Sequence, residues 1–404
     1  RGTLKGRYIT MEYTFSAKLQ NLKPSAIREI FKSLSDPSII AFAAGNPSPE
    51  SFPVEELAAI SAQIYKENPI SALQYSITEG YPPLRNAIAE RIKRKFNIGR
   101  DFDTTIVVSG GTQGIELAAK VLCNEGDAVI CEDPTFIGAL NSFRSNGIEV
   151  VGVPSDGGVI DPEKLERVIA ATPRAKMLYL IPTFHNPMGT TMPMSTRRAI
   201  YDICRRHKIL ILEDNPYGEL RFAGEDVPTL KSIDDDGIVI YCSSFSKILS
   251  AGIRVGYVCA PEPVIQKMVV AKQVEDVHTN IFFQMVCYRY MTEYDLDGHI
   301  KSICDIYRRK SSLMLNALDE YMPKSVKFTR PQGGLFVWCT LPDGIELDKV
   351  VKAALERKVA IVPGTAFNCD TSKPSKCFRL NYSTPTDEQI PEGVRLLADA
   401  IRSV

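Results

Sequence analysis

The stretch IVIYCSSFSKILSAGIRVGYVC, residues 238–259, contains two short apolar runs separated by a hydroxyl-rich segment with one lysine and one arginine. Such runs, rich in Val, Ile and aromatic residues and bounded by Gly or Ser, are typical of buried β-strands. Outward from this stretch, similar runs recur from about residue 104 and alternate with amphipathic segments. The seven predicted strands are Thr105–Ser109, Ala128–Cys131, Ile148–Val153, Met177–Ile181, Ile209–Leu212, Ile238–Cys242 and Val255–Cys259. The alternation predicts an α/β fold with one mostly parallel, seven-stranded sheet between layers of helices.

The segments between these strands have the pattern of helices. Gly114–Cys123 and Ser195–His207 are amphipathic, and Asp161–Ala171 begins with an Asp suited to cap a helix and a Pro suited to its first position. A long charged helix is expected around Ile300–Tyr321. Because 404 residues exceed one ordinary core, a large domain and a smaller α+β domain formed by both termini are predicted. The predicted divisions are 1–10 (possible leader or non-native residues), 11–54 (N-terminal arm and part of the small domain), 55–296 (large domain) and 297–404 (C-terminal part of the small domain).

Composition and charge limit the classes of function. Lys plus Arg and Asp plus Glu number 48 each, so no net field would draw the chain to nucleic acid or to an anionic membrane. The ten cysteines contain no C-x-x-C spacing, which favours buried thiols in a reducing cytoplasm, and the four isolated histidines predict no metal site. No apolar run reaches the roughly 18 residues that a membrane span needs. A small neutral or zwitterionic ligand fits this composition best.

Lys247 lies directly after a predicted buried strand, among Ser244 and Ser246, with Arg254 seven residues further on. Burial beside another cation would lower the pKa of the lysine ammonium and make its amine a nucleophile toward an aldehyde. The two hydroxyls and the guanidinium are donors of the kind that hold a phosphate. Taken alone, however, the segment is better explained as one more surface lysine, so the interpretation depends on what other segments supply.

Two other strand ends carry residues suited to a charged ligand. Ser109–Gly114, with the sequence SGGTQG, follows the first strand and opens a helix, where backbone N–H groups and the helix dipole bind phosphate. It lacks the G-x-G-x-x-G spacing of dinucleotide sites and the lysine of a P-loop, and such turns are often purely structural. Asp214 ends another strand, at the edge where open α/β sheets bind ligands. This carboxylate either holds a pyridine nitrogen protonated or caps a turn.

Five motifs occur in one order along the chain, namely GGTQG at 110–114, EDPTF at 132–136, HNPMG at 185–189, EDNPY at 213–217 and SSFSKILSAGIRVG at 243–256. In this order they resemble the class I and II aminotransferases of pyridoxal-phosphate fold type I, over nearly the whole chain from Ala41 to Ser383. The resemblance implies pyridoxal 5'-phosphate as cofactor. It also implies an enzyme that moves an amino group between an L-amino acid and a 2-oxo acid by a ping-pong mechanism.

The resemblance implies a role for each motif residue. Lys247 would hold the cofactor as an internal aldimine and then move the proton between the substrate Cα and the cofactor. Asp214 would pair with the pyridine nitrogen, and Asn186 and Tyr217 would hydrogen-bond the phenolic oxygen, so that Lys247, Asp214 and Tyr217 are the implied catalytic residues. The residues implied for the phosphate are Gly111, Thr112, Gln113, Ser244, Ser246 and Arg254.

Three further residues complete the implied cofactor and substrate site. Phe136 would stack on the cofactor ring, at a position where many relatives have tyrosine, so any contact by that hydroxyl would be absent. Arg379, in the run CFRLNYS at 377–383, would clamp the substrate α-carboxylate through its planar fork, although an arginine in a strand usually faces solvent. Tyr75 would reach the phosphate of a neighbouring subunit and make the enzyme a homodimer with shared sites, with a core tyrosine as the alternative.

The N-terminal segments LKPSAIREI at 22–30 and AAGNP at 43–47 are similar to the aminoadipate, kynurenine and multisubstrate branch of this family. In that branch an arginine at the position of Arg28 can meet the distal carboxylate of a dicarboxylic substrate, which favours 2-oxoglutarate and glutamate as one substrate pair. Gly45 and Asn186 are implied substrate contacts beside Arg379. Arg28 on a solvated helix face stays an alternative, and the identity of the other amino acid stays open.

Two other functions are compatible with the same motifs. Another fold type I enzyme, such as a C–S β-lyase, would have identical cofactor contacts and would release pyruvate and ammonia from a cysteine-type substrate without an added oxo acid. A transcription regulator that carries this domain behind a winged-helix module is disfavoured, because no basic N-terminal domain precedes the similar region.

Overall fold

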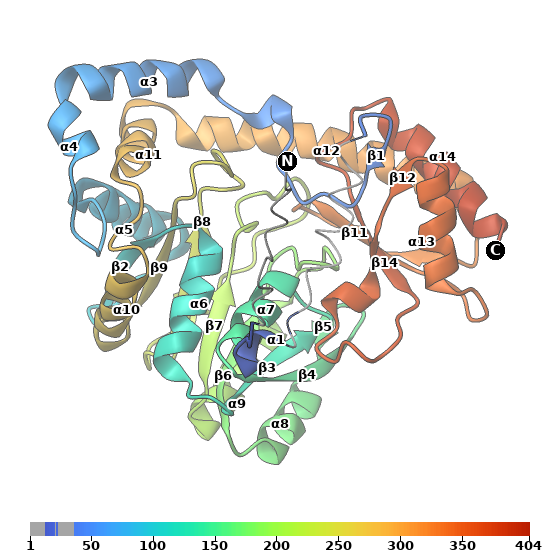
Figure 1. Cartoon of the computed structure of the whole chain (residues 1–404), viewed down its shortest axis with the longest axis horizontal. Helices are drawn as coiled ribbons and strands as arrows, with labels where there is room; N and C mark the ends of the chain where they lie inside the picture. The colour runs from blue at the N-terminus through green and yellow to red at the C-terminus, as the bar shows by residue number, and fades with distance from the viewer. Residues whose placement is uncertain (1–12, 21, 23–35) are drawn as a thin grey trace, which may run out of the picture.

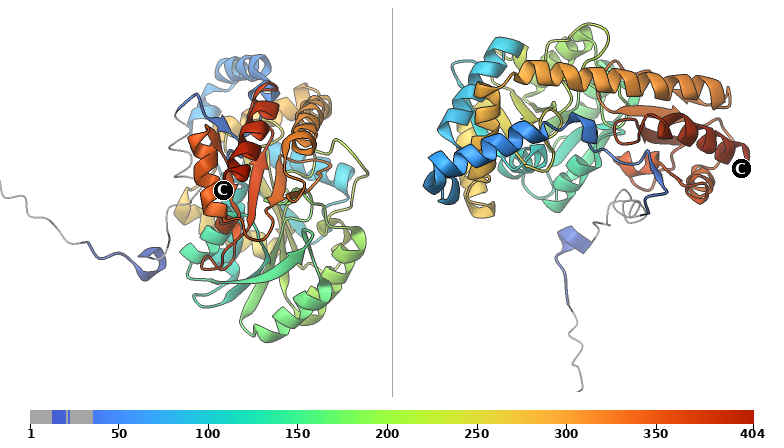
Figure 2. Two further views of the ribbon diagram at one scale, coloured as in Figure 1. Left: turned by 90° about the vertical axis from the view of Figure 1, so that its right-hand side faces the viewer. Right: turned by 90° about the horizontal axis from the view of Figure 1, so that it is seen from above.

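The computed structural model describes residues 13–20, 22 and 36–404 of the chain. Figure 1 shows a large β-sheet flanked by helices and, beside it, a smaller sheet packed against α13 (Leu347–Glu356) and α14 (Gln389–Arg402) near the C-terminus. The 26-residue helix α12 (Leu296–Tyr321) runs along both parts (Figures 1 and 2). In the described part of the chain, no helix combines the length and the apolar character that crossing a membrane requires.

The large sheet has the strand order β2-β9-β8-β7-β6-β3-β4-β5. Its strands are β2 (Asp103–Val108), β3 (Ala128–Asp133), β4 (Glu149–Asp156), β5 (Val159–Ile160), β6 (Ala175–Leu180), β7 (Leu210–Asp214), β8 (Val239–Ser244) and β9 (Gly256–Pro261). Neighbours from β8 to β4 are parallel, whereas β9 is antiparallel to both β8 and β2. The mostly parallel sheet with the predicted strands is thus confirmed. The additional β5 pairs antiparallel with β4, and two residues are too few to form a recognisable apolar run.

Most strands of the large sheet are buried along most of their length because helices cover the sheet, whereas β4 is largely half-buried. The buried parts of these strands are therefore mainly apolar, and polar residues gather toward the strand ends. β7 and β8 pair in register, with Asp214 opposite Cys242. Since parallel strands end at one edge of a sheet, Asp133, Asp214 and Ser244 all lie at its carboxyl edge, where open α/β sheets bind ligands.

The helices around the large sheet include those that the amphipathic segments predicted. They are α6 (Gly111–Leu122), α7 (Ile137–Ser145), α8 (Pro162–Ala171), α9 (Met194–His207) and α10 (Glu262–Glu275). Asp161 caps α8 as predicted, because its side chain accepts a 2.9 Å hydrogen bond from the backbone N–H of Glu163, and Pro162 is the first helical residue. A second group of helices, α3 (Val54–Glu67), α4 (Pro69–Leu73), α5 (Pro82–Phe96) and α11 (Ile281–Glu293), packs together at one end of the molecule (Figure 1).

The smaller sheet is antiparallel and has the order β10-β11-β14-β13. Its strands are β10 (Lys327–Phe328), β11 (Phe336–Thr340), β13 (Val362–Pro363) and β14 (Cys377–Asn381), and the short helices elsewhere are α1 (Ala17–Gln20), η1 (Pro49–Ser51), η2 (Lys231–Ile233) and η3 (Gly364–Phe367). β1 (Ile40–Ala41) pairs in parallel with β12 (Val359–Ala360), so an N-terminal segment joins the C-terminal part. The domain boundaries placed after residues 54 and 296 stay predictions.

Candidate active site

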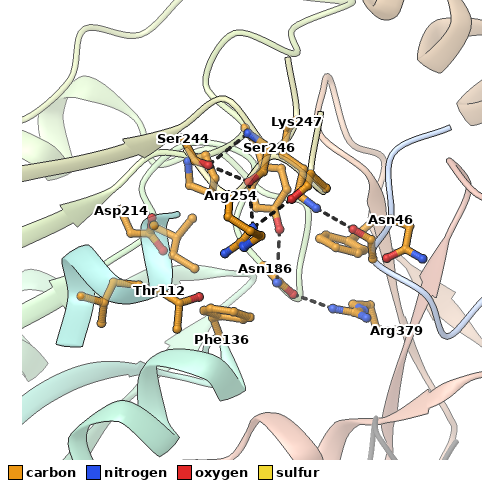
Figure 3. Close-up of a pocket in the computed structure, with 18 residues that line it drawn as sticks. Asn46, Thr112, Phe136, Asn186, Asp214, Ser244, Ser246, Lys247, Arg254 and Arg379 are labelled. Atoms are coloured by element: carbon orange, nitrogen blue, oxygen red, sulfur yellow. Dashed lines mark hydrogen bonds between the residues drawn. The ribbon is translucent and has the colours of Figure 1, made fainter. Parts of the chain in front are cut away.

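A cavity of about 350 Å³ opens where the carboxyl edge of the large sheet meets the smaller sheet. The predicted site residues that line it are Gly45, Gly111, Thr112, Phe136, Asn186, Asp214, Tyr217, Ser244, Ser246, Lys247, Arg254 and Arg379. In Figure 3, Lys247 and Arg379 lie on one side of the cavity, and Asp214 and Thr112 lie on the opposite side. The fold thus brings together residues from motifs that are far apart in the sequence.

Lys247 follows β8, in the segment that leads to Arg254 and β9. Its Nζ atom donates a 2.7 Å hydrogen bond to the carbonyl oxygen of Gly45. Burial, with smaller contributions from the positive charges of Arg379 and Arg254, lowers the pKa of Lys247 from 10.5 to about 8. Near pH 8 a large fraction of this side chain is therefore the free amine, the form that attacks a carbonyl group.

We expect Lys247 of the cofactor-free protein to react with acetic anhydride with a pH midpoint near 8. The sign follows from burial, which disfavours the ammonium, so that the reactive amine appears at a lower pH than in an exposed lysine. Labelling between pH 6.5 and 10.5, followed by mass spectrometry of the peptides, would measure the midpoint, with the exposed Lys301 of α12 as internal reference. A Lys247 midpoint near 10.5 would contradict the lowered pKa.

Asp214 is buried at the end of β7, and its Oδ2 atom accepts a 2.7 Å hydrogen bond from the hydroxyl of Tyr179 on β6. Burial raises the pKa of Asp214 to about 7, and the Tyr179 hydrogen bond acts in the opposite direction. Within the part of the chain that the structure describes, Asp214 forms no ion pair. A cationic partner from outside the chain would further favour the ionised form of this buried carboxylate.

Tyr179 was missed from the sequence. It lies in the apolar run Met177–Ile181, where a tyrosine is read as one more buried strand residue. Its hydroxyl is directed at Asp214 only because β6 and β7 are parallel neighbours, with Tyr179 beside Leu212. The local sequence holds no signal of this pairing.

Arg379 occupies the middle of β14 and is 3% exposed, so it does not face solvent. Its Nη1 atom donates to Asn186 Oδ1 at 2.8 Å, and its Nη2 atom donates to the Ala43 carbonyl at 3.0 Å. The guanidinium carbon lies 4.2 Å and 5.0 Å from the ring centroids of Phe336 and Phe367. Burial lowers the pKa of Arg379 to about 10, and its Nε atom has no acceptor among the described residues. A carboxylate would supply both the acceptor and the counter-charge.

Asn186 and Tyr217 form a hydrogen-bonded pair between Arg379 and the large sheet. The Asn186 Nδ2 atom donates to the Tyr217 hydroxyl at 3.4 Å, and both side chains are buried. Burial raises the pKa of Tyr217, so its hydroxyl keeps its proton and can donate a hydrogen bond near neutral pH. The rings of Tyr217 and Phe336 pack nearly perpendicular to each other with centroids 5.7 Å apart, and this contact restricts the Tyr217 ring.

Two hydroxyls and a guanidinium gather beside the first turn of α6. Ser244 Oγ donates to Ser246 Oγ at 2.7 Å, and Arg254 Nη1 donates to Ser246 Oγ at 3.2 Å. Gly110, with φ at +85°, precedes α6, and a Cβ atom there would overlap Arg254 Nη2. Glycine is therefore required for the arginine to reach the helix N-terminus, where free N–H groups attract an anion.

Two of the predicted site residues, Gln113 and Tyr75, do not line this cavity. The side chain of Gln113 accepts a 2.7 Å hydrogen bond from Lys272 and donates a 2.8 Å hydrogen bond to Asp276, so it ties α6 to α10 instead of facing a phosphate. Tyr75 is 80% exposed and lies outside the cavity of its own chain. Arg28 lies outside the described residues.

Some residues that were not among the predicted site residues also line the cavity. Asn46, Ile115 and Ile181 lie in its walls, and only their position in the fold reveals this. Phe136 has room for its ring because residue 138 is glycine, where a Cβ atom would overlap the ring.

Comparison with known proteins gives one family. Residues 37–397 match the family model described as aminotransferase class I and II. The chain is 39% identical over 399 residues to aromatic-amino-acid aminotransferase 1 of Thermococcus litoralis, with 97% of this chain and 95% of the relative covered.

Two solved structures are similar over nearly the whole chain. The Pyrococcus horikoshii kynurenine aminotransferase, in complex with PMP, KYN as substrates and KYA as products, has a TM-score of 0.92 and 36% identity, with 96% of this chain and 97% of that chain covered. LysN, the α-aminoadipate aminotransferase of Thermus thermophilus, complexed with N-(5'-phosphopyridoxyl)-L-leucine, has a TM-score of 0.87 and 37% identity, with the same coverage.

The residues of the cavity fit pyridoxal phosphate. An amine with a lowered pKa suits its aldehyde, a buried carboxylate without an ion pair suits its ring nitrogen, and the donors around Arg254 suit its phosphate. The chain therefore belongs to the class I and II aminotransferases, and it is a pyridoxal-phosphate-dependent enzyme that acts on amino acids.

Proposed function

We propose that Lys247 carries the proton between the Cα atom of the bound amino acid and the cofactor in a ping-pong transamination. The observation that most supports this is the presence, in one cavity, of an amine with a pKa of about 8 and a buried carboxylate without an ion pair. When bound, pyridoxal phosphate supplies the electron sink that stabilises the charge left by the departing proton. Asp214 would keep a proton on the ring nitrogen, and Tyr217 and Asn186, which already contact each other, would donate hydrogen bonds to the phenolic oxygen.

The experiment that tests this function uses the enzyme purified with pyridoxal phosphate. Adding L-glutamate without any oxo acid should change the cofactor absorption spectrum and release about one equivalent of 2-oxoglutarate per site, because a ping-pong enzyme stops after one half-reaction. Adding a second 2-oxo acid should then restore the original spectrum. Continuous release of pyruvate and ammonia from a cysteine-type substrate, without any oxo acid, would instead favour the β-lyase alternative.

The phosphate end of the cofactor would be held by the cluster beside α6. The backbone N–H groups of Gly111 and Thr112 lie in the first turn of that helix, where they lack acceptors within the helix. Ser244, Ser246 and Arg254 add two hydroxyls and a positive charge. The aromatic face of Phe136 would cover the ring of the cofactor, without the hydroxyl that a tyrosine would add.

The substrate α-carboxylate would be clamped by Arg379, with Gly45 and Asn186 beside it. Replacing Arg379 with lysine is expected to raise KM for every amino-acid substrate by roughly 10–100-fold, because a charge-assisted bidentate contact worth about 1.5–3 kcal/mol becomes a single contact. Steady-state kinetics with two amino acids would measure the effect. The exposed Arg330 gives a matched control when it is changed to lysine, and a KM within threefold of wild type in the Arg379 variant would contradict the clamp.

We further propose glutamate and 2-oxoglutarate as one substrate pair. The described cations that line the cavity are Lys247, Arg254 and Arg379, and each already has a proposed partner. A distal carboxylate therefore needs another cation, and Arg28 is the candidate that the N-terminal segment offers. The names and ligands of similar proteins specify kynurenine, α-aminoadipate, leucine or aromatic amino acids. They support an enzyme that accepts several amino acids as the other substrate.

Changing Arg28 to glutamine is expected to raise KM for glutamate by about tenfold or more while leaving KM for phenylalanine within about twofold, because only the distal carboxylate loses its counter-charge. The ratio of the two kcat/KM values measures this directly and cancels any general loss of activity. Equal changes in kcat/KM for glutamate and phenylalanine would show that Arg28 does not bind the distal carboxylate.

A homodimer with shared sites is also proposed. Large apolar side chains are exposed along α3, α4 and the loop after them, and a concentration of exposed apolar side chains favours an interface. These side chains are Val54 (68% exposed), Tyr65 (49%), Ile70 (75%), Leu73 (71%), Tyr75 (80%) and Ile77 (48%). A second copy of the chain would cover this surface and bring Tyr75 to the partner's cavity.

Hybrid dimers give a test of the shared site. Mixing a Lys247→Ala chain with a Tyr75→Phe chain should produce one fully wild-type site per hybrid, because that site combines Lys247 of one chain with Tyr75 of the other. Aminotransferase activity after mixing should therefore exceed that of either variant alone. The activity would be measured at a saturating cofactor concentration and again at a concentration about tenfold lower. If Tyr75 acts within its own chain, the hybrids will show no such gain.

A reducing compartment such as the cytoplasm remains the proposed location. All ten cysteines are unpaired, and most of them are buried. Burial raises the pKa of most of these thiols, including Cys204, Cys259 and Cys287, and so makes the reactive thiolate scarce.

A further inference from the structure

A second cavity, of about 510 Å³, borders the segment that follows β7. It lies between the C-terminal end of α5, which contributes Arg94 and Lys95, and the start of α9, which contributes Arg198. Asn215 and Arg221 line it from the β7 side. None of the residues that line this cavity belongs to the lining of the cavity around Lys247, although Asn215 is the chain neighbour of Asp214.

Arg221 is the most unusual residue of this second cavity, because its side chain is only 10% exposed. Its Nε atom donates to Asp226 at 3.0 Å, and its Nη1 atom donates to the Ala223 carbonyl and to Gln332 Oε1 at 3.2 Å and 3.3 Å. The guanidinium lies over the ring of Phe184, with 4.6 Å between its carbon and the centroid. Its Nη2 atom is buried and has no acceptor among the described residues. A buried charged donor without an acceptor is costly, and a bound ligand with a free oxygen would satisfy it.

The charges around this cavity are unbalanced in favour of cations. Asp226 is its acidic lining residue, and because its side chain is 90% exposed, solvent screens its charge. Lys95 is already paired with Glu219 at 2.5 Å and with Asp297 at 3.0 Å. Arg198, by contrast, forms no ion pair within the described ranges. The buried guanidinium of Arg221 and the exposed guanidinium of Arg198 therefore both have N–H donors without an acceptor in the described chain.

We propose that this second cavity binds a small ligand through an oxyanion, a carboxylate or a phosphate group, held between Arg221 and Arg198. The planar guanidinium of Arg221 suits such a group, and its contact with Phe184 fixes its plane. Asn215 Oδ1 is also buried without a donor among the described residues and offers an acceptor for a hydroxyl of the same ligand. A volume of about 510 Å³ exceeds what a lone ion fills, so the ligand carries a further organic part.

The ligand would bind beside the backbone segment that connects Tyr217 to Arg221. The backbone N–H of Leu220 donates to the Tyr217 carbonyl at 2.8 Å, and the Leu220 carbonyl accepts from Gly334 at 3.0 Å. Arg221 forms an isolated β-bridge with Gly333, in the turn just before Phe336. A ligand on Arg221 would therefore stabilise a segment that joins the large sheet to the smaller one, and would raise the thermal stability of the whole enzyme.

The test measures the melting temperature of the enzyme saturated with pyridoxal phosphate during titration with inorganic phosphate or with succinate. Potassium chloride at matched ionic strength is the reference for screening effects. A saturable rise in melting temperature is expected with at least one of the two anions, and the responding anion identifies the oxyanion class. Arg198→Gln and Arg221→Gln should each weaken the apparent affinity by about tenfold or more, because each removes a charge-assisted hydrogen bond.

Controls separate this site from the cavity around Lys247. Lys301→Gln, on the exposed face of α12, should leave the response unchanged. Because Arg198 is exposed, its variant should fold even if Arg221→Gln does not. A response that persists in Arg198→Gln but disappears in Arg379→Lys would place the anion in the substrate site and overturn the proposal. Absence of a saturable response to both anions would overturn it as well.

Discussion

Replacing Lys247 with alanine is expected to slow the half-reaction with L-glutamate by about 10²–10⁴-fold or more, the range that a positioned general base contributes. Lys247 is the lysine of the described chain that lines the cavity, and the other cations of the lining, Arg254 and Arg379, carry guanidinium groups and not amines. Single-turnover absorption measurements with cofactor-loaded protein would give the rate. They separate proton transfer from cofactor binding, because the loaded fraction is known before glutamate is added.

Chemical rescue supplies the control for this variant. A small amine such as methylamine can enter a cavity of about 350 Å³ and should restore part of the lost rate in Lys247→Ala. The same amine should not accelerate the wild-type enzyme. A Lys247→Ala protein that reacts within tenfold of the wild-type rate, without added amine, would rule out Lys247 as the base.

Changing Asp214 to asparagine is expected to lower kcat by about 10²–10³-fold while the protein still binds pyridoxal phosphate, a loss typical of removing one preorganised electrostatic contact. Asparagine keeps the shape of the side chain but removes the negative charge that holds a proton on the ring nitrogen. The kcat at saturating substrate and the bound cofactor per subunit would be measured together. An unchanged kcat would mean that the charge of Asp214 has no part in the reaction.

Tyr179→Phe is the matched, milder variant for this position. It removes the 2.7 Å hydrogen bond that stabilises the ionised form of Asp214, so the pKa of Asp214 should rise. The protonated, inactive form then persists to a higher pH, and the acidic limb of the pH–kcat profile should move toward alkaline pH. At the alkaline end of the profile the loss should be smaller than in Asp214→Asn, because the carboxylate can still ionise in Tyr179→Phe and is absent at every pH in Asp214→Asn.

Much of the fold could be predicted because short, local signals decide it. Apolar runs bounded by Gly, Ser or Pro marked the long strands of the large sheet, and Asp161 with Pro162 marked the start of α8. Asp214 was recognisable because it ends a buried strand, and strand ends of a parallel sheet share one edge. Lys247, three residues past the end of β8, was recognisable only together with the other ordered motifs.

Features that depend on neighbours far apart in the sequence could not be predicted. Tyr179 meets Asp214 through strand pairing, and Gln113 turns toward Lys272 because α10 packs on α6. Arg221 was not noticed because its cavity is formed by helix ends and a loop that share no motif. These contacts arise from tertiary packing, which periodicity and short motifs do not encode.

The pairing of β1 with β12, and the hydrogen bond between Ala43 and Arg379, have a consequence for biosynthesis. The two residues of that hydrogen bond are 336 positions apart, so the segment with Gly45 cannot reach its place until the ribosome has made β12 and β14. The large sheet can form first, since its strands lie between residues 103 and 261. A nascent chain would thus hold the hydroxyl and arginine cluster for a phosphate before it has any clamp for an amino acid, and the late long-range contact should limit the rate of maturation.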